Sequence, residues 1–243
     1  MDASSKRVDW LFGRGLSMGC GLVWAPVKEK LQELTREEQL RAIEDQLLAA
    51  MGDQSISTAP IRNFLTLMAE KTNKPWRHRL CTTNWDNLLQ KEVDAMVFEE
   101  LPEWMENSHV FHLNGGIEAA VHPDFRGGIL VEWDSESVRK FAPESESVFA
   151  RAQWNTTFVV VGMSFECAVD RLFLQQLGSV APHMPIGESR WIVVDPNCEA
   201  LKKVSERICC CLPGAQVYPV GMGFASWISN GAPELQRLGV ISN

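Results

Sequence analysis

The chain has 243 residues, of which 45% are hydrophobic and 22% are charged, and this composition excludes a fibrous or disordered protein. Lys and Arg total 23 against 31 Asp and Glu, so the formal net charge of -8 argues against direct nucleic acid binding. The longest apolar runs, such as 158–162, are far shorter than the roughly 18 residues of a membrane span, and no signal-like segment follows the N-terminus. We therefore expect a cytoplasmic protein without a membrane partner.

Seven cysteines are spread along the chain without the two-residue spacing that zinc ribbons use. A structural zinc is therefore not expected. The odd count also argues against a disulfide framework, and we expect all seven thiols to be reduced packing residues. They are Cys20, Cys81, Cys167, Cys198, Cys209, Cys210 and Cys211.

Short apolar runs alternate with helical patterns in the first half of the chain. A strand at 8–12 ends in a glycine-rich loop, an amphipathic helix at 28–51 is interrupted near Thr35, and Thr58 with Pro60 opens a second helix. Further strands are expected at 79–82, 96–99 and 110–113, and a helix that continues from Leu88 takes Asp86 as its N-cap.

The stretch 116–147 is expected to form a small insert or lid. Within and after it we expect a strand or edge hairpin at 129–133 and helix starts at Ser135 and at Ser145 or Ser147. The remaining elements are a buried strand at 158–162, a helix at 168–177, a loop at 179–189, a strand at 191–194, a helix at 198–208, a strand at 216–220 and a helix at 225–228. The pattern predicts one α/β domain over 1–243, with a doubly wound, mainly parallel, Rossmann-like sheet.

In such a sheet, ligands bind outside the carboxyl ends of the strands. The first loop there, 13–21, is rich in glycine, which can let the backbone approach a phosphate. It fails the dehydrogenase fingerprint because Met18 stands where glycine or alanine is needed, so a plain strand-to-helix turn is an equal alternative. The loops at 82–86, 112–116, 162–166 and 194–197 also follow strands; helix capping explains each one separately, but not their joint order.

Taken in order, these loops resemble the sirtuin-like family of NAD-binding domains. The segments that carry the resemblance are Gly13, Gly15, Ser17, Gly21 and Leu22; Thr83, Asn84 and Asp86 with Leu88 and Leu89; Val161 to Phe165; and Val194 to Asn197. The family's deacylases usually carry four zinc-binding cysteines after the catalytic histidine, and 116–147 contains none. The resemblance is therefore closer to the zinc-free bacterial branch associated with antiphage NAD depletion, and deacylase activity is not expected.

The resemblance implies NAD as substrate or ligand, without a metal. By this resemblance, Asn84 would hold the ribose or orient a water molecule, and Asp86 would accept a hydrogen bond from the nicotinamide carboxamide. Gly13, Gly15, Ser17, Gly162 and Ser164 would surround the pyrophosphate, and Asn197 would meet the adenosine ribose.

Two positions depart from the family pattern. Asn114 occupies the place of the catalytic histidine, and Asn cannot accept a proton near neutral pH. His112, two residues earlier on the same face of a strand, is a candidate substitute, although it would lie roughly 7 Å away. Arg14 could pair with the pyrophosphate, or its bulk could narrow the pocket and select another nucleotide.

These features lead to a hypothesis and two alternatives. The hypothesis is cleavage of the nicotinamide–ribose bond of NAD, as a glycohydrolase or by ADP-ribosyl transfer, weakened by the missing base. The first alternative is a module without catalysis that senses NAD or an ADP-ribose-like nucleotide for a regulatory partner. The second is a flavin- or thiamine-type relative. A homo-oligomer is left open.

Overall fold

Six parallel strands form one sheet in the order β3-β2-β1-β4-β5-β6. The computed structural model describes residues 6–24, 28–52, 55–97, 101–116 and 143–243. The strands of the sheet are β1 (Lys6–Phe12), β2 (Trp76–Thr82), β3 (Phe111–His112), β4 (Thr157–Val161), β5 (Arg190–Val194) and β6 (Gln216–Val220). The chain builds outward from β1 to β3 and then returns to place β4 against the other side of β1, so the strand order reverses between β1 and β4.

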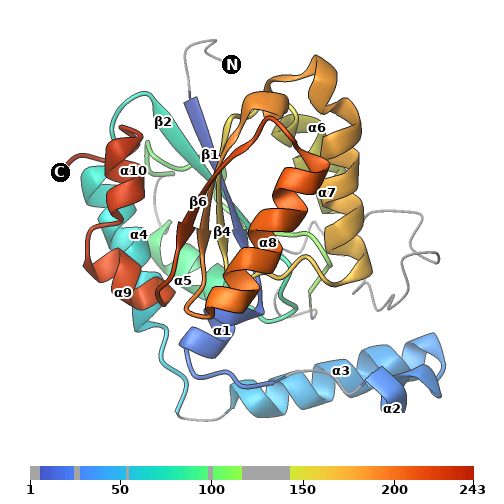
Figure 1. Cartoon of the computed structure of the whole chain (residues 1–243). Helices are drawn as coiled ribbons and strands as arrows, with labels where there is room; N and C mark the ends of the chain where they lie inside the picture. Colours follow the sequence, from blue (N-terminus) through green and yellow to red (C-terminus); the bar gives the residue numbers. More distant parts are fainter. Residues whose placement is uncertain (1–5, 25–27, 53–54, 98–100, 117–142) are drawn as a thin grey trace.

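Helices cover both faces of this sheet (Figure 1). One face packs against α4 (Ala59–Lys71), α5 (Leu88–Met96), α9 (Phe224–Ser229) and α10 (Pro233–Arg237), and the other against α6 (Pro143–Ala152), α7 (Ala168–Val180) and α8 (Cys198–Cys211). The short α1 (Arg14–Gly19) follows β1, and α2 (Lys28–Gln32) and α3 (Arg36–Met51) extend from the same end of the molecule. The predicted doubly wound α/β fold is confirmed.

The central strands are apolar on both faces because they separate two cores. Trp10 and Phe12 of β1 point into the first core, whereas Leu11 points into the second, together with Phe158 and Trp191 of the neighbouring strands. Period-2 alternation between two apolar environments gives the near-continuous hydrophobic runs seen in the sequence.

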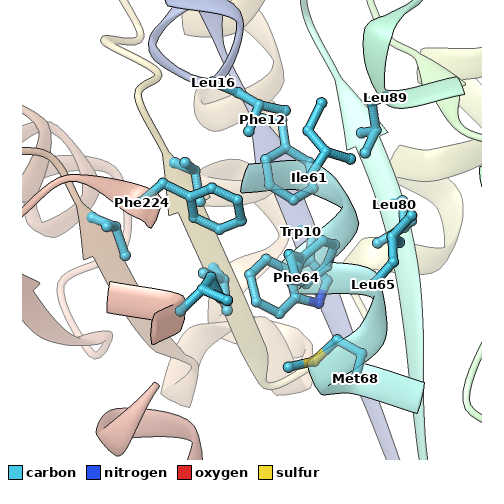
Figure 2. Close-up of a cluster of buried hydrophobic side chains, with 14 of the residues drawn as sticks. Trp10, Phe12, Leu16, Ile61, Phe64, Leu65, Met68, Leu80, Leu89 and Phe224 are labelled. Carbon is cyan, nitrogen blue, oxygen red and sulfur yellow. The ribbon is translucent and has the colours of Figure 1, made fainter. Parts of the chain in front are cut away.

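Aromatic rings pack together in the first core, among aliphatic side chains (Figure 2). The Trp10 and Phe64 ring centroids are 4.5 Å apart, and Phe12 meets Phe224 edge-on at 5.8 Å. The Trp10 indole N–H donates to Nδ1 of the buried His78 over 2.8 Å, so its polar atom is satisfied. This cluster supports the carboxyl end of β1, where Phe12 is the last residue of the strand.

A buried ion pair interrupts the second core. Arg79 of β2 holds Asp9 of β1 with two hydrogen bonds, Nε to Oδ1 at 2.8 Å and Nη2 to Oδ2 at 2.6 Å, and both side chains are inaccessible to solvent. This pairing explains how an aspartate fits inside the otherwise apolar β1.

Most predicted elements are found, with shifted ends. The helix expected at 28–51 is interrupted at Thr35, which forms a capping box with Glu38 at the start of α3. The helix predicted from Ser145 or Ser147 begins earlier, at Pro143. The strand at 129–133, the helix start at Ser135 and most of the 116–147 insert lie outside the described residues.

Several predictions are wrong in detail. Met96, expected to begin a strand over 96–99, is the last residue of α5, because the amphipathic helix simply continues; 98–100 lie outside the described residues. The N-cap of α5 is Asn87, although the Asp86 carboxylate does accept the Leu88 backbone N–H. The expected loop at 179–189 contains two 3-10 turns, η2 (Ala181–His183) and η3 (Pro185–Glu188), and α10 was not anticipated.

The cysteines are not all packing residues. Cys20 and Cys81 are buried, but four of the others are exposed and Cys211 is half-buried. For Cys209 and Cys210 the physical reason is the helical period of α8, which buries Leu201, Val204 and Ile208 and turns the following positions outward. The exposed cysteine residues are Cys167, Cys198, Cys209 and Cys210; the sulfur atom of Cys167 is nonetheless largely shielded from solvent where it meets Asp170.

Candidate functional site

A cleft of about 870 Å³ lies at the carboxyl edge of the sheet, where the strand order reverses between β1 and β4. Loops that follow β1, β2, β4 and β5 contribute to its wall, as expected for ligand sites of open α/β sheets. Every residue proposed for the site from the sequence lines this cleft, except His112. The lining residues proposed in advance are Gly13, Arg14, Gly15, Ser17, Asn84, Asp86, Asn114, Gly162, Ser164 and Asn197.

The glycines of the first loop pack against the loop after β4. Gly13 N–H donates to Val161 O and Gly15 N–H donates to Gly162 O, each over 2.9 Å. Gly162 has a φ of +56°, and a Cβ placed there would stand 2.4 Å from the Gly15 Cα atom. The close approach of two backbones therefore requires these glycines, and the N–H groups of Gly13 and Gly15 are already used within the chain.

A hydrogen-bonded chain of three side chains joins the first loop to the loop after β2. Asn84 Nδ2 donates to Ser17 Oγ at 2.8 Å and to Gly13 O at 3.0 Å, and Ser17 Oγ donates to Asp86 Oδ2 at 2.7 Å. Burial raises the pKa of Asp86, and the hydrogen bond from Ser17 opposes that rise. Because the amide nitrogen of Asn84 is held by two acceptors, its amide oxygen is the atom left to receive a donor from a ligand.

A second polar group surrounds Asn114. Its Nδ2 donates to Asp170 Oδ1 at 3.2 Å and faces Thr83 O at 3.4 Å, while Oδ1 has no hydrogen-bond partner among the described residues. Asp170 stands in the first turn of α7, is 7% exposed and also lines the cleft. Burial raises its pKa to about 6.

His112 is placed differently from the other proposed residues. It ends β3, is buried, and does not line the cleft; its Nδ1 lies 3.3 Å from the backbone oxygen of Asn84. Burial lowers its pKa to about 4, so the ring is neutral at physiological pH. The geometry thus favours Asn114 over His112 as the residue that meets a ligand.

Ser164 and Asn197 serve their local backbone as well as the cleft. Asn197 Oδ1 caps α8 by accepting from Glu199 and Ala200 N–H, and Ser164 Oγ accepts from Glu166 N–H at 3.2 Å. The capping interpretation is therefore correct for Asn197, whereas Ser164 stabilises a turn before α7, whose N-cap is Cys167. Both roles are compatible with the position of these residues in the wall.

The lining of the cleft combines aromatic and charged side chains. The Trp24 and Trp85 ring centroids lie 6.2 Å apart. Arg14 is the single cation among the described lining residues, whereas four of them are acidic: Asp86, Glu166, Asp170 and Asp195.

Sequence analysis missed the acidic residue beside Asn114. Asp170 lies three positions into a helix, where an acidic residue ordinarily complements the helix dipole, so nothing in the pattern singled it out. Its distance along the chain from Asn114 also hid the pairing. The sequence feature that could have pointed to Asp170 is its position shortly after the loop at 162–166, which follows a buried strand.

The described part of the chain holds no cluster of three or more His, Cys, Asp or Glu side chains arranged for a metal ion. None of its helices is long and apolar enough to cross a membrane.

Comparison with known proteins adds a likeness to solved structures. No family model and no curated protein matches the chain. A solved structure described as "Structural Basis for the Mechanism and Regulation of Sir2 Enzymes" aligns with 98% of this chain and 94% of its own, at 11% sequence identity and a TM-score of 0.49. At that identity and TM-score, the likeness assigns no family, activity or residue role to this chain.

Proposed function

We propose that the cleft binds NAD and that the protein cleaves the nicotinamide–ribose bond, by hydrolysis or by ADP-ribosyl transfer. The observation that supports this proposal is the convergence, on one cleft, of the loops whose residues resemble the sirtuin-like set, from Gly13 to Asn197. These loops follow five different strands, so their meeting at one site is not a consequence of sequence proximity.

The chemistry of the wall suits such a ligand. The Asn114 Oδ1 atom is a buried acceptor without a partner among the described residues, which fits a ribose hydroxyl. Arg14 offers the positive charge for a pyrophosphate, and the neighbouring rings of Trp24 and Trp85 fit a planar ring. The acidic remainder of the wall disfavours a ligand held by charge alone.

Two residues would act on the bond that breaks. Asn84, with its amide nitrogen fixed, would present its oxygen to the ribose or to a water molecule. Asp86 would accept a hydrogen bond from the carboxamide of the nicotinamide group. Bound NAD supplies the leaving group and the ribose carbon that is attacked; the protein orients both.

The absence of cysteine from 116–147 weighs against the zinc-dependent deacylase activity of the family. We therefore extend the resemblance to its zinc-free bacterial branch, with a role in antiphage NAD depletion. This finer assignment rests on sequence alone.

The alternative is a binding module that senses NAD or ADP-ribose without turnover, which the missing histidine at position 114 favours. Incubating the pure protein with NAD and following nicotinamide release, while measuring ADP-ribose affinity by calorimetry, separates the two. Affinity for ADP-ribose without nicotinamide release supports the sensor. If the protein shows no affinity and no release, both the cleavage proposal and the sensor are contradicted.

Asn84→Ala is the direct test of the site. Removing the side chain breaks the hydrogen bonds to Ser17 and Gly13 and removes the proposed ribose contact, so nicotinamide release should fall by at least ~10²-fold. Asn73→Ala is the matched control, because Asn73 lies just before the other end of β2 and bonds only Gly239 O through its side chain. Unchanged release in Asn84→Ala contradicts the site assignment.

A further inference from the structure

The wall of the cleft contains a buried carboxyl group that neither the motifs nor the proposed roles use. Asp170 is 7% exposed, and its Oδ1 accepts a hydrogen bond from Asn114 Nδ2. The Cys167 thiol also hydrogen-bonds the carboxyl group, and the Asp170 backbone N–H lies 3.5 Å from Cys167 Sγ. Asn114, Cys167 and Asp170 all line the cleft.

The surroundings of Asn114 fix the orientation of its amide. Nδ2 faces three acceptors: Asp170 Oδ1 at 3.2 Å, Thr83 O at 3.4 Å and Cys167 Sγ at 3.7 Å. Rotating the amide by 180° would place its oxygen against Thr83 O and the carboxylate, which is repulsive. The amide oxygen is thus held away from these acceptors, ready to receive a hydroxyl or a water molecule.

Asp170 is suited to accept a proton near neutral pH. Burial raises its pKa to about 6, with Asn114 and Cys167 opposing that rise through hydrogen bonds and Arg171 of the same helix through its charge. The Cys167 thiol stays protonated, because burial and the neighbouring Asp170 raise its pKa to about 12. Between pH 5 and 7, therefore, Asp170 is the member of this group that changes charge.

We propose that Asp170 is the proton-accepting residue of the cleft and that it takes over, beside Asn114, the task of the missing histidine. The proposal rests on the proposed cleavage of NAD. As a bond forms between the water oxygen and the anomeric carbon, the Asp170 carboxylate takes a proton from that water. The bond from this carbon to the nicotinamide nitrogen breaks, and its electron pair leaves with neutral nicotinamide.

A purely structural role for Asp170 predicts a different response of ligand binding to pH. Acidic residues in the first turn of a helix stabilise it through the helix dipole when they are ionised. Asp170 is in addition buried in the cleft wall and holds a side chain from another element. The two roles differ in whether ligand binding responds to the protonation of this residue.

ADP-ribose tests this response without any turnover. Its anomeric hydroxyl occupies the place of the attacking water and would donate to the ionised carboxylate, so binding should weaken roughly fivefold to tenfold between pH 7 and pH 5. In Asp170→Asn, the pH dependence over this range should disappear, and the affinity at pH 7 should fall roughly fivefold to tenfold, to about the wild-type value at pH 5. Calorimetric titration of both proteins across this range gives the answer.

Nicotinamide release supplies the second readout. Asp170→Asn keeps an oxygen that can hold Asn114 but cannot take a proton, so kcat should fall by ~10²–10⁴-fold with KM nearly unchanged. Asp45→Asn on the exposed surface of α3 removes the same charge and should match the wild type. Circular dichroism verifies that both variants fold.

The outcomes separate the two proposals. If the wild type binds ADP-ribose without releasing nicotinamide, the cleavage proposal fails, yet loss of the pH dependence in Asp170→Asn still supports Asp170 as the proton acceptor. A kcat in Asp170→Asn within threefold of the wild type overturns the inference. A pH dependence of binding that is retained in Asp170→Asn also overturns it. Loss of ADP-ribose binding at every pH in this variant overturns it as well, because Asp170 would then only maintain the shape of the pocket.

Discussion

Two buried carboxyl groups, Asp86 and Asp170, stand in the wall of one cleft, and at the scale of single residues they define its chemistry. Burial raises both pKa values. Their partners differ, because a hydroxyl donor from Ser17 holds Asp86 whereas an amide donor from Asn114 holds Asp170. Carboxyl groups in different surroundings are free to take different roles, one in binding and one in proton transfer.

Asp170→Asn should make the protein more stable at neutral pH. The pKa of Asp170 is raised from 3.8 to about 6, so the folded state binds more protons than the unfolded state between these values, and stability falls as pH rises through this window. The full cost, about 3 kcal/mol, is present above pH 6 and disappears below pH 3.8. Urea unfolding at pH 7.5 should therefore show Asp170→Asn to be more stable, with a gain roughly half as large at pH 5.

Equal stability of the two proteins at pH 7.5 would contradict the assigned ionisation. Asp45→Asn again serves as the control, since it removes an exposed charge.

At the scale of elements, the contact between the loop after β1 and the loop after β4 sets the shape of the cleft floor. Three glycines allow it: Gly13 and Gly15 on one side and Gly162 on the other. Two backbone hydrogen bonds fasten the contact. The glycines that resemble a nucleotide-binding pattern therefore have a packing reason that is independent of any ligand.

Gly162→Ala should disrupt this contact. The new Cβ would meet backbone atoms of Gly15 at 2.4 Å, and the φ of +56° is unfavourable for alanine, so we expect a loss of roughly 2–4 kcal/mol in unfolding free energy and loss of ADP-ribose binding. Gly221→Ala is the matched control, because nothing lies within 4 Å of a Cβ there. Thermal denaturation and calorimetry measure the two effects. Wild-type behaviour of Gly162→Ala would show that the loops tolerate separation.

Periodicity identifies an element well when its surroundings are uniform. The strands β4 and β5 were predicted closely because both of their faces meet apolar cores. The two-residue β3 and the end of α5 were predicted less well, since a short apolar run such as 96–99 fits a helix end and a strand equally. The pairing of Asp170 with Asn114 could not be predicted, because it depends on how α7 approaches the loop after β3.

At the scale of the whole molecule, the cleft belongs to no single segment. Its walls come from loops after β1, β2, β3, β4 and β5 and reach Leu47 of α3 and Phe224 of α9. The order of motifs along the chain predicted that such a site would form at the strand ends. It did not predict that His112 would stay outside the wall, because the two-residue β3 ends at His112 and leaves Asn114 in the loop beyond it.

A ligand that contacts so many elements should stabilise the entire fold. At a concentration one hundred times the Kd, ADP-ribose is expected to add about 2.7 kcal/mol, which for a chain of this size corresponds to a rise in Tm of roughly 5–10 °C. Differential scanning fluorimetry measures this shift, with inorganic pyrophosphate as the control that lacks ribose and base. A Tm unchanged by saturating ADP-ribose would argue against the cleft as its site.

The central position of β1 also governs when the site can form. Asp9 of β1 pairs with Arg79 of β2 through its side chain and with Phe158 of β4 along the sheet. The loop after β1 can therefore pack against the loop after β4 only once β4 has been synthesised. Parallel pairing between such distant segments is slow compared with local helix formation. During synthesis, the glycine loop leaves the ribosome about 150 residues before the loop after β4 that docks against it. Under the proposed function, the ability to bind NAD would therefore arise only after β4 has been synthesised, and truncated products that end before β4 should not bind it.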